Sequence, residues 1–182
     1  LKKTQQRSSL PVSFIANPDT LPQRIAISEH GNYLATSHDL SVTLYHRETS
    51  GHITTMRTFE VCKDCLLGLY ISEEPQMIIT AGSYHHCNFH IVDFKGAHLR
   101  PPVQSDISDG ISVVTEKHTR RSVYLSESSE IRVFRATTSV KNEFKDFGKE
   151  HSMFGHKGKV LGVTFSADGS RAYSLSSDKT LK

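Results

Sequence analysis

Short apolar segments alternate with polar turns along most of the chain, and their order repeats. Each unit begins with an apolar segment, passes through a polar turn into a second segment, and ends with a third. The first segments are RIAIS (24–28), LGLYIS (67–72), ISVVT (111–115) and VLGVTF (160–165); the second are YLATS (33–37), MIITA (77–81), SVYLS (122–126) and AYSLS (172–176); the third are SVTLYH (41–46), NFHIVDF (88–94), EIRVFR (130–135) and TLK (180–182). Such segments, bounded by Gly, Asp and Ser, are typical of β-strands. We therefore predict an all-β fold built from repeated three-stranded units.

The spacing of these units indicates a repeat architecture. Their first strands end at Ile27-Ser28, Ile71-Ser72, Val114-Thr115 and Phe165-Ser166, which gives spacings of 44, 43 and 51 residues. The first two spacings fall within the roughly 40–45 residues of a β-propeller blade. The third is longer because residues 136–152 read as a polar, Lys-rich insertion of loop character. The run from Met77 to Ile79 lacks strict alternation, as expected of a strand whose two faces are both covered by neighbouring sheets.

The last unit carries the most specific motif. Gly155-His156 precedes its first strand, Ser174 lies in its second, and Asp178 lies in the turn before its third. This arrangement resembles the WD-repeat family of β-propellers. The resemblance implies that His156, Ser174 and Asp178 form a structural hydrogen-bond network with a Trp of the third strand, which this chain lacks.

The earlier units match the family by pattern and not by motif. Thr36 and Asp39 fit the Ser and Asp positions of the first unit, which has no Gly-His where one is expected. The Trp position of the first three units holds Tyr45, Val92 and Phe134, and the acidic position after it holds His46, Asp93 and Arg135. These units are therefore interpreted as degenerate copies.

The resemblance implies a domain organisation. Residues 1–20 would end a preceding blade, residues 21–62, 63–106 and 107–152 would be degenerate blades, and residues 153–182 would begin a well-kept blade. The sequence stops two residues before the usual Trp-Asp, so we expect a fragment with about four blades of a larger, seven-bladed ring. Blades bury their faces only against neighbours, so the isolated chain should be poorly stable.

The composition is that of a folded globular protein and does not identify a reaction or a ligand. A formal charge of +3, with 36% hydrophobic and 23% charged residues, is compatible with a packed core. Its longest apolar run, residues 65–71, is far shorter than the roughly 20 residues that cross a bilayer. We expect an intracellular, cytoplasmic protein. The unit spacing also resembles an endoplasmic-reticulum-associated member of the family, which would imply association with that organelle.

The three cysteines do not form a convincing metal or redox site. Cys62, Cys65 and Cys87 cannot all pair, which favours a reduced protein. Zinc sites use four ligands, usually from two paired motifs, whereas only the single Cys62-x-x-Cys65 pair is present. No helix is expected after that pair, which argues against a redox motif. We expect neither metal nor cofactor.

Ser174, His156 and Asp178 also have the composition of a hydrolytic triad. A nucleophilic serine needs an exposed position and an oxyanion hole, typically at a strained turn such as G-x-S-x-G. Ser174 instead lies within an apolar strand. We therefore expect a structural role for the three residues and no enzyme activity, with a propeller hydrolase as the weaker alternative.

The favoured function is a non-catalytic scaffold that binds other proteins or peptides in a multiprotein complex, as the WD-repeat resemblance implies. Partner contacts are expected from the turn at 83–88 and from the 136–152 insertion, since loops on a rigid scaffold tend to carry recognition. The candidate contact residues are Ser83, Tyr84, His85, His86, Lys141 and Lys145. The alternative is a component of an RNA–protein assembly. Direct nucleic-acid binding is disfavoured because the basic residues are scattered among acidic ones and no aromatic stacking pattern accompanies them.

Overall fold

The computed structural model describes residues 23–61, 65–83, 88–104, 110–115, 121–126, 129–166 and 170–182. Within these ranges the fold is all-β, without helices, and all strand pairing is antiparallel. Three sheets have four strands each, and a two-stranded hairpin follows them. This architecture is consistent with a partial WD β-propeller, whose blades are four-stranded sheets. The all-β prediction is therefore confirmed.

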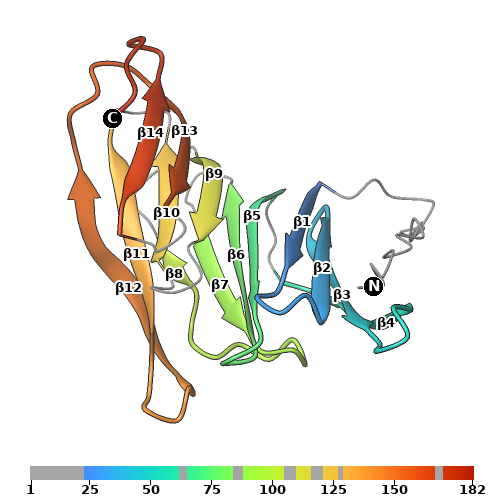
Figure 1. Ribbon diagram of the computed structural model, residues 1–182. Coiled ribbons are helices and arrows are strands. Elements are labelled where there is room, and N and C mark those ends of the chain that lie inside the picture. Colours follow the sequence, from blue (N-terminus) through green and yellow to red (C-terminus); the bar gives the residue numbers. More distant parts are fainter. Residues whose placement is uncertain are drawn as a thin grey trace, which may run out of the picture.

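Strands within each sheet follow chain order, so every sheet is a simple meander. The first sheet contains β1 (Arg24–Ile27), β2 (Tyr33–His38), β3 (Ser41–Arg47) and β4 (Ile53–Glu60); the second contains β5 (Cys65–Ser72), β6 (Met77–Ser83), β7 (Asn88–Val92) and β8 (Val103–Gln104); the third contains β9 (Gly110–Thr115), β10 (Arg121–Ser126), β11 (Ile131–Thr138) and β12 (Phe144–Met153); the last hairpin contains β13 (Val160–Phe165) and β14 (Ala172–Ser176). Figure 1 shows the sheets side by side in this order, from the blue first sheet to the red hairpin.

Each of the first three predicted units corresponds to the first three strands of a sheet, and the structure adds a fourth strand. In the last unit the first two predicted segments form β13 and β14, and Leu181 of the third makes an isolated bridge to Leu175. These added strands are β4, β8 and β12, which lie at the edge of their sheets. An edge strand needs few buried positions, so its sequence can be mostly polar. In β4, for example, the four central residues 55–58 are all exposed.

The interpretation of residues 136–152 as a loop insertion is wrong. They form the end of β11 and most of β12, joined by a turn at 139–143, and the two strands pair from Ile131↔Met153 to Thr138↔Phe144. Polar residues dominate β12 because it is the outermost strand of its sheet. Phe147 shows that this strand is part of the packed fold, because its side chain is completely buried and packs against the rings of Phe89 and Phe134.

The hydrophobic core lies between consecutive sheets and not within one of them. One apolar cluster joins the first and second sheets, a second joins the second and third sheets, and a third joins the third sheet to the last hairpin. The middle strand β6 shows the principle, because Ile78 belongs to the first cluster while Ile79 belongs to the second. Its continuous apolar run therefore serves two interfaces, as the sequence predicted.

Candidate functional site

The last hairpin positions the site that the sequence singled out. Strand β12 ends at Met153, and the chain then passes through Gly155 to His156 before β13 begins. Gly155 has φ = 141°, a conformation that side chains rarely adopt. The glycine thus allows the chain to leave one sheet and place the His156 side chain beside the next.

His156 joins three segments of the hairpin by hydrogen bonds. Its side chain is only 2% exposed, with Nε2 2.8 Å from the Ser174 hydroxyl and Nδ1 3.1 Å from Asp178 Oδ2. A carboxylate can only accept, so Nδ1 carries the proton that is donated to Asp178, and in the neutral ring Nε2 accepts the proton of Ser174. The Thr180 hydroxyl lies 3.1 Å from the same Nδ1. The three predicted residues are therefore brought together.

Asp178 organises the turn after β14. Its carboxylate accepts the Thr180 hydroxyl at 2.6 Å, the Lys157 amide at 2.8 Å and the Thr180 amide at 2.9 Å. The Thr180 hydroxyl, then the two amides and His156, hold the pKa of Asp178 well below its usual range, although desolvation opposes them. The ionised carboxylate therefore ties the start of the repeat, at Lys157, to its final strand.

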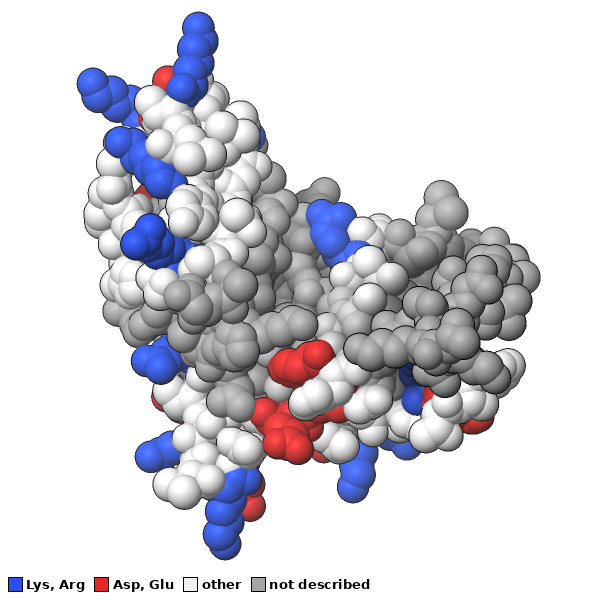
Figure 2. Space-filling model, viewed as in Figure 1, with Lys and Arg blue, Asp and Glu red and all other residues white. Residues whose placement is uncertain are grey.

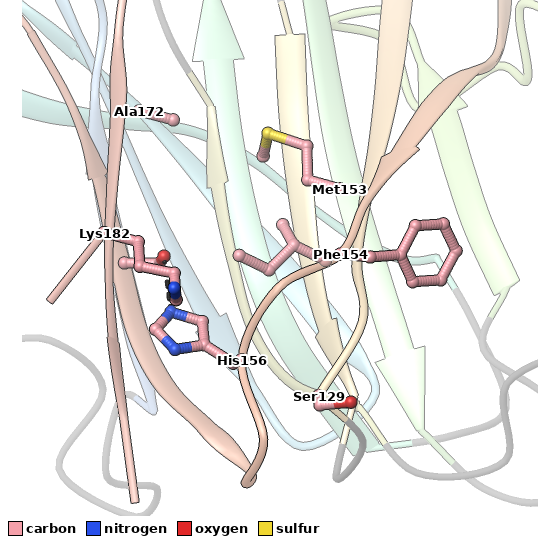
Figure 3. Close-up of a pocket in the computed structure, with 8 residues that line it drawn as sticks. Ser129, Met153, Phe154, His156, Ala172 and Lys182 are labelled. Carbon is pink, nitrogen blue, oxygen red and sulfur yellow. Dashed lines mark hydrogen bonds between the residues drawn. The ribbon is translucent and has the colours of Figure 1, made fainter. Parts of the chain in front are cut away.

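A pocket of about 160 Å³ lies between the third sheet and this hairpin. Its walls are mainly apolar and its floor includes the His156–Ser174 pair; the lining residues are Ser129, Ile131, Met153, Phe154, His156, Ala172, Ser174 and Lys182. Figure 3 shows that the phenyl ring of Phe154 points away from the other lining side chains, and this residue is 77% exposed. The pocket is therefore bounded by the backbone of Phe154 and not closed by its ring.

The geometry of Ser174 argues against nucleophilic catalysis. Its hydroxyl and the His156 ring have the separation of a catalytic pair, but Ser174 lies within β14 and is 6% exposed. Its backbone amide, which could contribute to an oxyanion hole, donates to the Lys182 carbonyl at 2.8 Å. We therefore keep the interpretation of these residues as a network that holds the hairpin together.

The first sheet contains a second group of buried, hydrogen-bonded polar side chains, which the sequence analysis did not predict. The Thr36 hydroxyl lies 2.9 Å from His38 Nε2 and 3.4 Å from the Tyr45 hydroxyl, and all three residues are buried. His38 thus contacts Thr36 in this unit, which lacks a Gly-His. Residues two apart on a strand share a face, and the pair Thr36-x-His38 was the signal available in the sequence.

The predicted partner-contact residues lie in different settings. Lys141 lies in the exposed turn between β11 and β12, and Lys145 lies on β12 itself and is also exposed. Ser83, which was expected in a turn, is the last residue of β6 and pairs with Cys65, because that strand continues beyond its apolar run. Tyr84, His85 and His86 lie outside the described residues. The sequence also overlooked Val140, which is fully exposed at the tip of the β11–β12 turn.

The described part of the chain offers no arrangement of three or more His, Cys, Asp or Glu side chains that could hold a metal ion. Of the three cysteines, Cys65 begins β5, while Cys62 and Cys87 are outside the described residues. None of the described segments forms a helix with the length and apolar character needed to cross a membrane.

Comparison with known proteins agrees with the position of this site. The family model described as "WD domain, G-beta repeat" matches residues 148–182, which include His156, Ser174 and Asp178. A comparison with curated proteins found no match. The last unit therefore carries a WD repeat, which supports the WD-repeat family for a chain whose other sheets follow the same meander.

Proposed function

We propose that this protein is a non-catalytic scaffold that holds other proteins or peptides in a multiprotein complex. The observation that carries this proposal is the WD repeat at 148–182 in a series of stacked four-stranded sheets. Repeats of this family commonly mediate protein–protein contacts, and fold by itself gives no more than that analogy. The occupied amide of Ser174 also favours a role without catalysis.

The β11–β12 hairpin is the part of the scaffold best suited to contact a partner. Figure 1 shows its tip projecting beyond the ends of the neighbouring strands. The turn is well ordered by its own bonds, since the Ser139 hydroxyl accepts the amides of Lys141 and Glu143 at 3.2 Å each. The tip thus presents Val140 and Lys141 on a fixed turn, which keeps the ordering cost of binding low.

Affinity capture from cell extract tests this role. We expect the triple variant Val140→Asp, Lys141→Glu, Lys145→Glu to lose at least one partner that the wild type retains, with an unchanged melting temperature. Lys95→Glu is the control, since Lys95 is an exposed lysine on the β7–β8 turn of another sheet. If the control loses the same partners, or if neither variant changes the captured set, the hairpin is not the contact surface.

The alternative function, as a component of an RNA–protein assembly, can be tested in the same affinity-capture experiment. Among the described residues in Figure 2, Lys and Arg are scattered over the left flank, the upper middle and the bottom of this face, while Asp and Glu gather near its lower centre. Scattered basic groups beside acidic ones do not favour a phosphate-binding surface. Partners that disappear after nuclease treatment would support an RNA-linked assembly. Binding to RNA at low salt, lost as salt rises, would support direct contact.

A finer assignment is also proposed. The unit spacing resembles that of transducin beta-like protein 2, a member of the family associated with the endoplasmic reticulum, and this would place the protein at that organelle in place of a purely cytoplasmic location. Fractionation of cells that express the protein decides between the two locations.

A further inference from the structure

Two glutamates reach across the joint between the first and second sheets. Glu29 lies in the β1–β2 turn, and Glu73 lies in the β5–β6 turn, 44 positions later. Glu29 accepts the Tyr70 hydroxyl through Oε1 at 3.0 Å and the Glu73 amide through Oε2 at 3.0 Å. Both donors belong to the second sheet, so a carboxylate of the first sheet is bound by its neighbour.

Glu73 makes the converse contact. Its Oε1 accepts the Ser28 hydroxyl and the Asn32 amide, the latter at 3.3 Å, and its Oε2 accepts the Asn32 side-chain amide at 2.9 Å. The Glu73 side chain is only 11% exposed, and His30 Nδ1 lies 3.4 Å from Oε2. A carboxylate so far removed from water is stable only when donors satisfy it. The β1–β2 turn supplies those donors.

We propose that Glu29 and Glu73 form a reciprocal clasp that fixes the first sheet against the second, and that protonation of Glu73 opens this joint before the rest of the molecule unfolds. An ionised carboxylate only accepts hydrogen bonds, whereas a protonated one presents a hydroxyl donor. In Glu73 that donor would face the Ser28 hydroxyl or the amides of Asn32. Protonation therefore removes the charged acceptor from the bonds of Ser28 and Asn32, and it sets a donor against the N–H groups of Asn32, which cannot accept.

The groups around the clasp determine the direction of its pH dependence. Among the described residues, the titratable groups that the hydrogen bonds and ion pairs place beside Glu73 at this joint are Glu29 and His30 of the first sheet and Tyr70 of the second. Desolvation acts to raise the pKa of Glu73, but the hydrogen bonds from Ser28 and Asn32, together with the charge of His30, lower it overall. The stabilisation is therefore complete above the ordinary glutamate pKa of about 4.3 and is lost as the pH falls through the lower folded value.

The sequence repeats the elements of the clasp. Ser28-Glu29 and Ser72-Glu73 occupy equivalent places in successive units, each directly after the first strand of its sheet. The third unit has Thr115-Glu116 at this place, and the last has Ser166-Ala167, so the sequence repeats the carboxylate in the first three units and not in the last.

Hydrogen exchange of the whole chain tests the clasp, because the amides of Asn32 and Glu73 themselves donate across the joint. In Glu73→Gln, peptides covering 28–33 and 70–76 should exchange at least about tenfold faster at neutral pH, the factor expected when a bond to a charged group is lost. Glu60→Gln, at the exposed end of β4, is the matched control and should exchange as the wild type does. Equal exchange in the two variants, or an equal acceleration in peptides covering 131–153, overturns the proposal.

A pH titration of the wild type provides the second measurement and does not depend on any variant folding. After correction for intrinsic exchange rates, the same two peptides should open first as the pH falls from 7 to about 3.5, below the ordinary glutamate pKa. Glu73→Gln should show little further opening of these peptides over that range. Simultaneous opening of all sheets in the wild type contradicts the clasp.

Discussion

Truncation of Phe147 to alanine should destabilise the joint between the second and third sheets by about 3–5 kcal/mol. Phe147 is completely buried, its ring centroid lies 5.1 Å from that of Phe89 and 5.7 Å from that of Phe134, and the Phe134 ring is stacked on it. Both neighbours are themselves buried, so the vacated space is enclosed by side chains that already pack against other groups. The cost should therefore lie in the range for an unfilled core cavity.

Equilibrium denaturation measures this cost, and two further variants calibrate it. Phe147→Leu keeps most of the volume and should cost less than about 1.5 kcal/mol. Val140→Ala, in the same hairpin but fully exposed, should change stability by no more than about 0.5 kcal/mol. If Phe147→Ala is as mild as Val140→Ala, then β12 does not close the core and residues 136–152 behave as a loop.

Three further predictions concern the last hairpin. Ser174→Ala leaves Nε2 of the buried His156 without its partner and should lower the free energy of unfolding by about 1–3 kcal/mol, with no change in background ester hydrolysis; a turnover that depends on Ser174 would contradict the structural role. Asp178 has a depressed folded pKa, so its stabilisation is complete above its ordinary pKa of about 4 and declines as the pH falls below that value; Asp178→Asn should flatten this acid decline in urea midpoints measured between neutral pH and about pH 3. Gly158→Ala should destabilise, because its Cβ would lie 2.6 Å from the Ser177 hydroxyl oxygen and 3.0 Å from the Asp178 amide nitrogen, whereas Gly162→Ala meets no atom within 4 Å and should be tolerated; equal melting temperatures for the two would refute the close packing of this turn.

The sequence revealed the strands that pack on both sides and missed those at the edges. Strand β6 could be recognised from its continuous apolar run, because Ile78 and Ile79 belong to different hydrophobic clusters. Strand β12 could not be recognised in this way, since an outer strand can be stable with few buried residues such as Phe147. Hydrophobic pattern therefore reports how much of a strand is covered, and a strand covered on little of its surface resembles a loop.

The candidate site could be anticipated only where side chains follow the WD-repeat pattern. His156, Ser174 and Asp178 lie within hydrogen-bonding distance as the resemblance implied. The contacts of Glu29 with Tyr70 and of Glu73 with Ser28 could not be anticipated, because they join different units and depend on how two sheets are placed. Local sequence patterns do not report such contacts. The division of the chain into blades at 21–62, 63–106 and 107–152 and the blade count of a complete ring stay predictions.

Consecutive sheets pack face to face, and strands β5, β6 and β7 of the second sheet each contribute side chains to both neighbouring interfaces. Methyl NOE spectroscopy tests this claim most directly, with labels on Ile78 and Ile79. Ile78 should show cross-peaks to the first sheet, as to Leu44, and Ile79 should show them to the third, as to Phe134. Cross-peaks from both residues to the same neighbouring sheet, or to neither, would contradict this packing.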